Sequence, residues 1–178
     1  MNANKNKGKT YERTVCKIFS DFFGLSFTRI PNSGSFIGGK NFHRAATMSD
    51  SQVLLSRGDI IVPDELRRLC IECKSRKGFG FHQLLTEDGS RTMNEWIDQT
   101  LVGVEGSDVA ISLIVFKPNN CGNFVLFDVK CGLKIPRCHV LYAYRNVEYA
   151  VACLNEDFLK LNKEVFLEKC GKNQSNPG

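Results

Sequence analysis

Three residues in one short stretch have the types and the spacing that can hold a divalent metal against a phosphate. Residues 58–77 read GDIIVPDELRRLCIECKSRK and contain two apolar runs, 59–62 and 69–73, joined by a polar turn. β-Branched runs bounded by turn residues are typical of strands, so the two runs predict a β-hairpin. Side chains alternate along a strand, which places Glu72 and Lys74 on one face, about 7 Å apart. The hairpin would bring Asp59 towards Glu72.

Two carboxylates and an ammonium group at a sheet edge suit metal-assisted chemistry on a phosphate ester. Mg²⁺ is commonly bound by one or two carboxylates together with substrate phosphate oxygens. A bound metal lowers the pKa of water and stabilises charge in the transition state. Lys74 would orient or deprotonate that water, or neutralise developing charge. The alternative is a surface hairpin with an exposed Glu72–Lys74 pair, but solvated charges inside apolar runs are unusual.

The composition is that of one soluble globular domain. The chain has 178 residues, of which 42% are hydrophobic and 24% charged, enough for one domain with its own core. Its start, MNANKNKGKT, is polar and basic rather than a signal peptide, and the longest apolar run, 109–116, is too short to span a bilayer. We therefore expect a cytoplasmic protein without a membrane part.

The eight cysteines fit a reducing compartment if they are free thiols. Free cysteine behaves as a small hydrophobe, and burial is the favoured interpretation. Zinc binding by Cys70 and Cys73 is the alternative. An odd offset on a strand would put these two side chains on opposite faces, where they could not share a metal.

Positive charge is concentrated before the predicted hairpin. The whole chain has a formal charge of +5, whereas residues 1–57 alone have nine Lys and Arg against three acidic residues. The other 121 residues have 15 basic and 16 acidic groups. Concentrated positive charge favours a polyanionic partner such as nucleic acid. For residues 1–9 alone, a solubilising tail is the alternative.

The periodicity of apolar residues predicts a single α/β domain over 9–170, between disordered tails at 1–8 and 171–178. Helices are expected at 9–23, from a Thr92–Glu95 capping box to Val104, and from an Asn155 cap to Lys169. Further strands are expected at 25–30, 109–116, 123–129 and 139–144. This order predicts a mixed central sheet flanked by helices.

The connection 31–57 is long for a compact domain and is expected to be a mobile loop. Its turn-forming start, PNSGSFIGG, leads into a polar segment in which aromatic and basic residues alternate. Such residues in a mobile loop favour contact with nucleic acid, although an insertion without a role is the alternative.

Four blocks of the sequence resemble the archaeal-type Holliday-junction resolvases. They are GKTYER at 8–13, RIPNSGS at 29–35, GDI at 58–60 and IECKSRK at 71–77. These resolvases are PD-(D/E)xK nucleases with a restriction-endonuclease-like fold. The Asp-Glu-Lys set is shared across that superfamily, whereas the Glu-Arg pair and the Arg…Ser-Gly-Ser block are more specific to resolvases. The resemblance covers residues 8–77, and the connection from Ser35 to Asp59 looks longer than in the compact archaeal members.

The resemblance implies roles for individual residues. Glu12, Asp59 and Glu72 would ligate Mg²⁺, or Mn²⁺ as a substitute, Lys74 would act on the attacking water, and Ser35 would contact the scissile phosphate region. These five form the expected catalytic set. The expected DNA-binding residues, of which Arg13 and Arg29 would hold the backbone, are Lys9, Arg13, Arg29, Ser33, Arg44, Arg57, Arg76 and Lys77.

The favoured hypothesis is a metal-dependent endonuclease that resolves four-way DNA junctions. The resemblance also implies a homodimer whose two sites cut opposite strands. Small nucleases of this kind occur in bacteriophages, so the compartment could be the host-cell cytoplasm. One alternative is a restriction-like, nicking or repair endonuclease that acts on duplexes, flaps or ends. The second is a non-catalytic DNA-binding module, against which the full set Glu12, Asp59, Glu72 and Lys74 argues.

Overall fold

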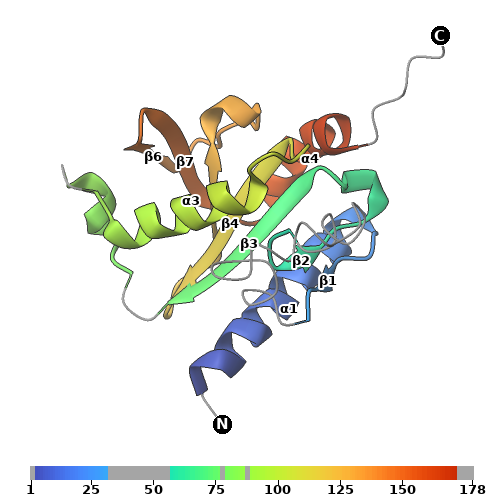
Figure 1. Ribbon diagram of the computed structural model, residues 1–178, viewed down its shortest axis with the longest axis horizontal. Helices are drawn as coiled ribbons and strands as arrows, with labels where there is room; N and C mark the ends of the chain where they lie inside the picture. The colour runs from blue at the N-terminus through green and yellow to red at the C-terminus, as the bar shows by residue number, and fades with distance from the viewer. Residues whose placement is uncertain (1–2, 32–56, 77–78, 87–88, 172–178) are drawn as a thin grey trace.

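Helices cover both faces of one five-stranded sheet (Figure 1). The computed structural model describes residues 3–31, 57–76, 79–86 and 89–171. In chain order the helices and strands are α1 (Ala3–Phe23), β1 (Thr28–Arg29), β2 (Ile60–Ile61), β3 (Leu69–Arg76), α3 (Arg91–Val104), β4 (Ile111–Pro118), β5 (Phe124–Asp128), β6 (His139–Tyr144), β7 (Val147–Cys153) and α4 (Glu156–Cys170).

The sheet has the strand order β3-β4-β5-β7-β6. β3 and β4 run parallel, whereas the pairs β4–β5, β5–β7 and β6–β7 are antiparallel. The fold is therefore the α/β arrangement with a mixed central sheet that the sequence predicts. β3 is an outer strand, so one of its edges is free to meet segments from outside the sheet.

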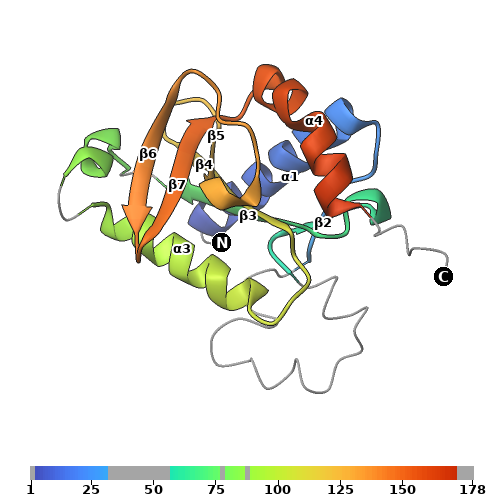
Figure 2. The same cartoon turned by 90° about the horizontal axis from the view of Figure 1, so that it is seen from above.

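Alternation of side chains gives the sheet two apolar faces. One face packs against α1 and α4 through residues such as Val15, Phe19, Ile71 and Phe166. The opposite face packs against α3, and its core includes Met93, Trp96, Ile97, Phe116 and Leu126. Figure 2 shows α3 on one side of the sheet and α1 with α4 on the other. Both faces of the sheet are therefore covered by helices.

Two helices begin at positions that differ from the prediction. α1 begins at Ala3 rather than Lys9, and it therefore includes most of the segment 1–8 that was expected to be a disordered tail. Extension of an existing helix needs no new nucleus, which explains how a polar segment continues it. α3 is capped by Ser90, whose hydroxyl accepts a hydrogen bond from Met93 N–H, and not by Thr92. The Asn155 cap of α4 is confirmed.

The predicted hairpin between 59–62 and 69–73 is wrong. β2 pairs antiparallel with β1, and β3 pairs in parallel with β4. Pro63 precedes a short 3-10 turn, Asp64–Leu66, whose Leu66 side chain is fully buried. This turn directs the chain into the core instead of reversing it tightly. β3 therefore pairs with β4, which lies far along the sequence, and not with β2.

The strand β7 was not predicted, although it lies between β5 and β6 in the sheet. It follows β6 after a two-residue turn in which Arg145 and Asn146 have φ values of 49° and 62°. Positive φ at both central positions is the geometry of a type I′ turn, which joins antiparallel strands tightly. The turn contains neither Gly nor Pro, so the sequence has no strong signal there.

Three further expectations concern the whole chain. All eight cysteines are free, and Cys70 and Cys73 point to opposite faces of β3 as predicted. No helix in the described ranges is long and apolar enough to cross a membrane. The predicted mobile loop 31–57 and the tail 171–178 fall almost entirely outside the described residues, since only Pro31, Arg57 and Gly171 are described.

Candidate active site

Backbone contacts hold Asp59 at the free edge of β3. Its N–H donates to the carbonyl of Ile71 (2.9 Å), and its carbonyl accepts from Ile30 N–H (2.9 Å). Its carboxylate oxygen Oδ2 accepts from the backbone N–H of Cys73 (2.8 Å). These three bonds fix both the position and the orientation of the Asp59 carboxylate, without the predicted hairpin.

Gly58 allows the chain to approach β3 this closely. Its φ is +70°, a left-handed conformation that other residues rarely adopt. A Cβ atom at this position would lie 2.6 Å from the Ile71 carbonyl oxygen. The glycine of the GDI block therefore has a structural role, which is to bring Asp59 against the strand.

Glu72 and Lys74 lie on the face of β3 that α3 covers. They are in register with Ile114 and Phe116 of β4, whose side chains face α3. The side chains of Glu72 and Lys74 are each 19% exposed. The sequence prediction that these two residues share a face is confirmed.

The surroundings of the Glu72 carboxyl disfavour its negatively charged form. Burial and the nearby charge of Asp59 raise its pKa to about 7, although Lys74 acts in the opposite direction. A protonated Glu72 carboxyl donates a hydrogen bond to Asp59, which raises its pKa further. Two carboxylates that compete for one proton can also share one cation.

Lys74 lies between Glu72 and a residue of α3. Its Nζ is 3.4 Å from Glu72 Oε2 and 3.0 Å from Oε1 of Gln99. Gln99 was not predicted from the sequence, and it lies 25 residues further along the chain than Lys74. No local pattern could have indicated it, because its position depends on how α3 packs on the sheet.

Glu12 projects from α1 close to Asp59 but is bound to another partner. Its Oε2 accepts a hydrogen bond from Arg29 Nε, and both side chains are largely buried. Burial and the charge of Asp59 raise the pKa of Glu12, whereas the contact with Arg29 lowers it. In this structure the Arg29 guanidinium is thus engaged with a protein carboxylate at the site.

The pair Asp59 and Glu72 fits a divalent cation. Mg²⁺ prefers oxygen ligands and is commonly held by one or two carboxylates plus waters and substrate oxygens. In the described ranges no group of three or more His, Cys, Asp or Glu is arranged to hold a metal. Glu12, which pairs with Arg29, is therefore not gathered with Asp59 and Glu72 as a third ligand in this arrangement.

The expected DNA-binding residues fall into three groups. Arg13 and Arg76 are exposed, and Lys9 is partly exposed on the same helix as Arg13. Arg29 and Arg57 are engaged with protein carboxylates: Arg29 pairs with Glu12, and Arg57 donates to Asp108 Oδ1 (2.8 Å) and lowers the pKa of that carboxyl. The remaining members, together with Ser35 of the catalytic set, lie outside the described residues: Ser33, Arg44 and Lys77.

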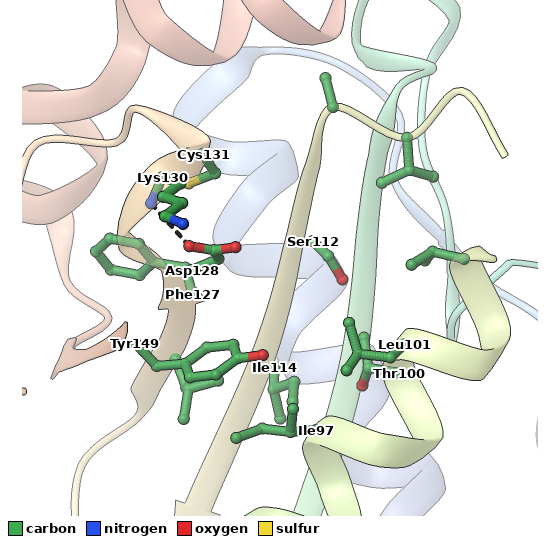
Figure 3. Close-up of a pocket in the computed structure, with 14 residues that line it drawn as sticks. Ile97, Thr100, Leu101, Ser112, Ile114, Phe127, Asp128, Lys130, Cys131 and Tyr149 are labelled. Atoms are coloured by element: carbon green, nitrogen blue, oxygen red, sulfur yellow. Dashed lines mark hydrogen bonds between the residues drawn. The ribbon is translucent and has the colours of Figure 1, made fainter. Parts of the chain in front are cut away.

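A separate cavity of about 310 Å³ lies between α3 and the sheet (Figure 3). Apolar residues such as Ile97, Ile114 and Phe127 line it, together with Asp128 and Tyr149. None of Glu12, Asp59, Glu72 or Lys74 borders this cavity. The carboxylate site is therefore separate from this cavity.

A mixed sheet with Asp59, Glu72 and Lys74 gathered at an outer strand is the arrangement of a PD-(D/E)xK nuclease with a restriction-endonuclease-like fold. A family model described as "Phage putative PDDEXK endonuclease" matches residues 3–168. The chain belongs to this family of phage endonucleases. No curated protein and no solved structure gave a match to the chain.

Proposed function

We propose that this protein is a divalent-metal-dependent endodeoxyribonuclease that cleaves branched DNA and resolves four-way junctions. The observation that supports it best is the convergence of the Asp59 and Glu72 carboxylates beside the Lys74 ammonium at the free edge of β3. Family membership supports nuclease activity. The preference for junctions is supported by the blocks 8–13 and 29–35, which resemble junction resolvases.

The residues of the site have separate tasks in this proposal. A cation held by Asp59 and Glu72 would supply a water of lowered pKa and stabilise charge on the phosphate. The backbone contacts of Asp59 keep its carboxylate oriented before substrate arrives. Lys74 orients the attacking water or offsets the charge that develops on the phosphate. Ser35 is proposed to contact the scissile phosphate region.

Glu12 is proposed to act with the metal site from α1. It is near enough to Asp59 for their charges to interact, and Arg29 balances its charge. Release of this ion pair would make a third carboxylate available to the metal and a guanidinium available to a phosphate. We therefore still propose that Glu12 ligates the metal and that Arg29 contacts DNA, once the ion pair between them is released.

The DNA backbone is proposed to contact the exposed basic residues around the site. Lys9 and Arg13 lie on the first half of α1, and Arg76 ends β3 two residues after Lys74. Ser33, Arg44 and Lys77 complete the proposed contact set, and Arg57 would join it on release from Asp108. Two copies of the chain, acting as a homodimer in the cytoplasm of the phage host, would cut opposite strands of one junction.

The test compares cleavage of an end-labelled four-way junction with that of a linear duplex of the same sequence. Wild-type protein is expected to make paired, symmetric cuts in the junction with Mg²⁺ or Mn²⁺ and none with EDTA. Glu72→Gln keeps the size of the side chain but removes the charge, and it should reduce cleavage at least about a thousandfold while binding persists.

Other outcomes separate the alternatives. Equal cutting of the duplex or of a flap would retain the metal site but indicate a restriction-like, nicking or repair endonuclease. Cleavage by Glu72→Gln at the wild-type rate would show that the site is assigned wrongly. Tight binding without cleavage of any DNA with either metal would indicate a non-catalytic DNA-binding module.

A further inference from the structure

The contacts of Lys74 are the starting point, because its ammonium can act only if it is held over the reacting phosphate. A lysine side chain has four methylene groups, and holding it in one conformation costs rotamer entropy. Lys74 projects from an outer strand, where only one neighbouring strand is present. Some contact from outside the sheet must therefore restrict it.

Gln99 of α3 provides the shorter of the two described contacts. The distance from Lys74 Nζ to Gln99 Oε1 is 3.0 Å, within the usual range for an N–H···O hydrogen bond. The distance to Glu72 Oε2 is 3.4 Å, longer than that range. The Gln99 amide oxygen therefore accepts a hydrogen bond from the Lys74 ammonium and can hold that group in one place.

The position of Gln99 is fixed by its helix and not by burial of its own side chain, which is exposed. α3 is anchored on the sheet by the buried side chains of Trp96 and Ile97. Tyr144 OH donates to Asp98 Oδ2 (3.0 Å), and Tyr142 OH donates to Asn94 Oδ1. These contacts with β6 set the rotation of α3, which leaves Gln99 directed at the opposite sheet edge, where Lys74 lies.

We propose that Gln99 is a positioning residue, whose amide oxygen holds the Lys74 ammonium at the edge of β3 and thereby sets the rate of phosphodiester cleavage. The inference rests on the proposed nuclease function. It adds α3, an element that carries none of the predicted site residues, to the parts of the fold that prepare the site.

The first arm of the test is the wild-type protein on a junction, a flap and a linear duplex with Mg²⁺. Cleavage of at least one of them is required by the proposed function. Failure to cut any of them would overturn that function, and this inference with it. The substrate that the wild type cuts fastest is then used for the variants.

The second arm replaces Gln99 by methionine, which keeps the length of the side chain but removes the acceptor. Gln99→Met should lower kcat about tenfold, the effect of one hydrogen bond to a charged group, and leave KM within about twofold. Gln99→Glu, which retains an oxygen of the same reach, should restore most of the lost kcat. Both variants should keep the wild-type melting temperature, because the side chain is exposed.

Glu95→Gln is the matched control, since Glu95 lies one turn earlier on α3 and pairs with Arg91 instead of Lys74. It should cleave at the wild-type rate. A wild-type kcat for Gln99→Met would overturn the inference. A loss of kcat that Gln99→Glu does not restore, or that Glu95→Gln shares, would also overturn it, because it would show a general effect of altering α3.

Discussion

Burial and charge act together on Glu72, and their effect should be measurable without any substrate. Its pKa of about 7 lies above its ordinary value of 4.5, first because the carboxyl is buried and then because Asp59 is close. The folded protein therefore holds a proton over a pH range in which the unfolded chain has released it. The free energy of unfolding must fall as pH rises through that range.

We expect the stability of the wild type in EDTA to decrease relative to Glu72→Gln between pH 4.5 and pH 8, by on the order of 2 kcal/mol. Urea unfolding at several pH values would measure it. Mg²⁺ or Mn²⁺ should raise the melting temperature of the wild type more at pH 8 than at pH 5, since a cation replaces the shared proton. Parallel pH profiles for the two proteins would contradict the assignment of this carboxyl.

The sequence predicted how the candidate site residues lie relative to one another better than the contacts around them. The residue types and their period-two spacing were sufficient to predict that Glu72 and Lys74 share one face, because a strand fixes the relative directions of its side chains locally. The contact between Asp59 and Glu72 was anticipated from a hairpin that does not exist. It forms instead because Gly58 lets the chain approach β3 closely. Gln99 and the Glu12–Arg29 pair depend on packing between distant segments, which local patterns do not encode.

At the scale of elements, α3 connects the site to the far edge of the sheet. It contacts Lys74 of β3 through Gln99 and the tyrosines of β6 through Asn94 and Asp98. Its first turn is fixed by Ser90, whose backbone N–H donates to Tyr142 OH (3.0 Å). The contacts at the start of α3 therefore help to set the position of Gln99, and through it the position of the Lys74 ammonium.

Ser90→Ala should destabilise the protein by about 1 kcal/mol, the usual effect of losing an N-cap hydroxyl. Ser90 is buried and its Oγ accepts from Met93 N–H at 3.3 Å. Thr92→Ala is the matched control, because Thr92 is the cap that the sequence pattern predicted. It should change the free energy of unfolding by less than about 0.5 kcal/mol. A larger effect at Thr92 than at Ser90, measured by urea unfolding, would favour the capping box.

The strands show why the bounds and pairing of secondary-structure elements are harder to predict than the relative directions of neighbouring side chains. β6 was predicted with the bounds it has, because its apolar run ends at a turn. β7 was missed because that turn, Arg145–Asn146, lacks the Gly or Pro that marks most turns. The pairing of β2 with β1, and of β3 with β4, joins segments far apart in sequence. Such long-range pairing depends on how all the apolar side chains pack together in the core, which local sequence patterns do not encode.

At the scale of the molecule, the two helix layers leave one edge of the sheet for chemistry. In the described part of the chain, α1 and α4 cover one face and α3 covers the other, so in the proposed complex DNA would approach Asp59 and Glu72 along the outer edge of β3 (Figures 1 and 2). α1 carries Lys9 and Arg13, and β3 ends at Arg76. These three basic residues would thus bring positive charge next to the site in the proposed complex.

Arg13→Gln should weaken DNA binding and make it less dependent on salt, because each phosphate contact releases counterions. Measured in the Glu72→Gln background to prevent cleavage, the slope of log K against log salt should be less steep by about 0.9 for duplex DNA. Lys163→Gln is the control, because Lys163 is an exposed residue of α4 and its substitution removes the same charge as Arg13→Gln. An unchanged slope for Arg13→Gln would exclude a phosphate contact at Arg13. An equal change for both variants would mean that the effect comes from net charge, and that α1 does not lie along the DNA backbone.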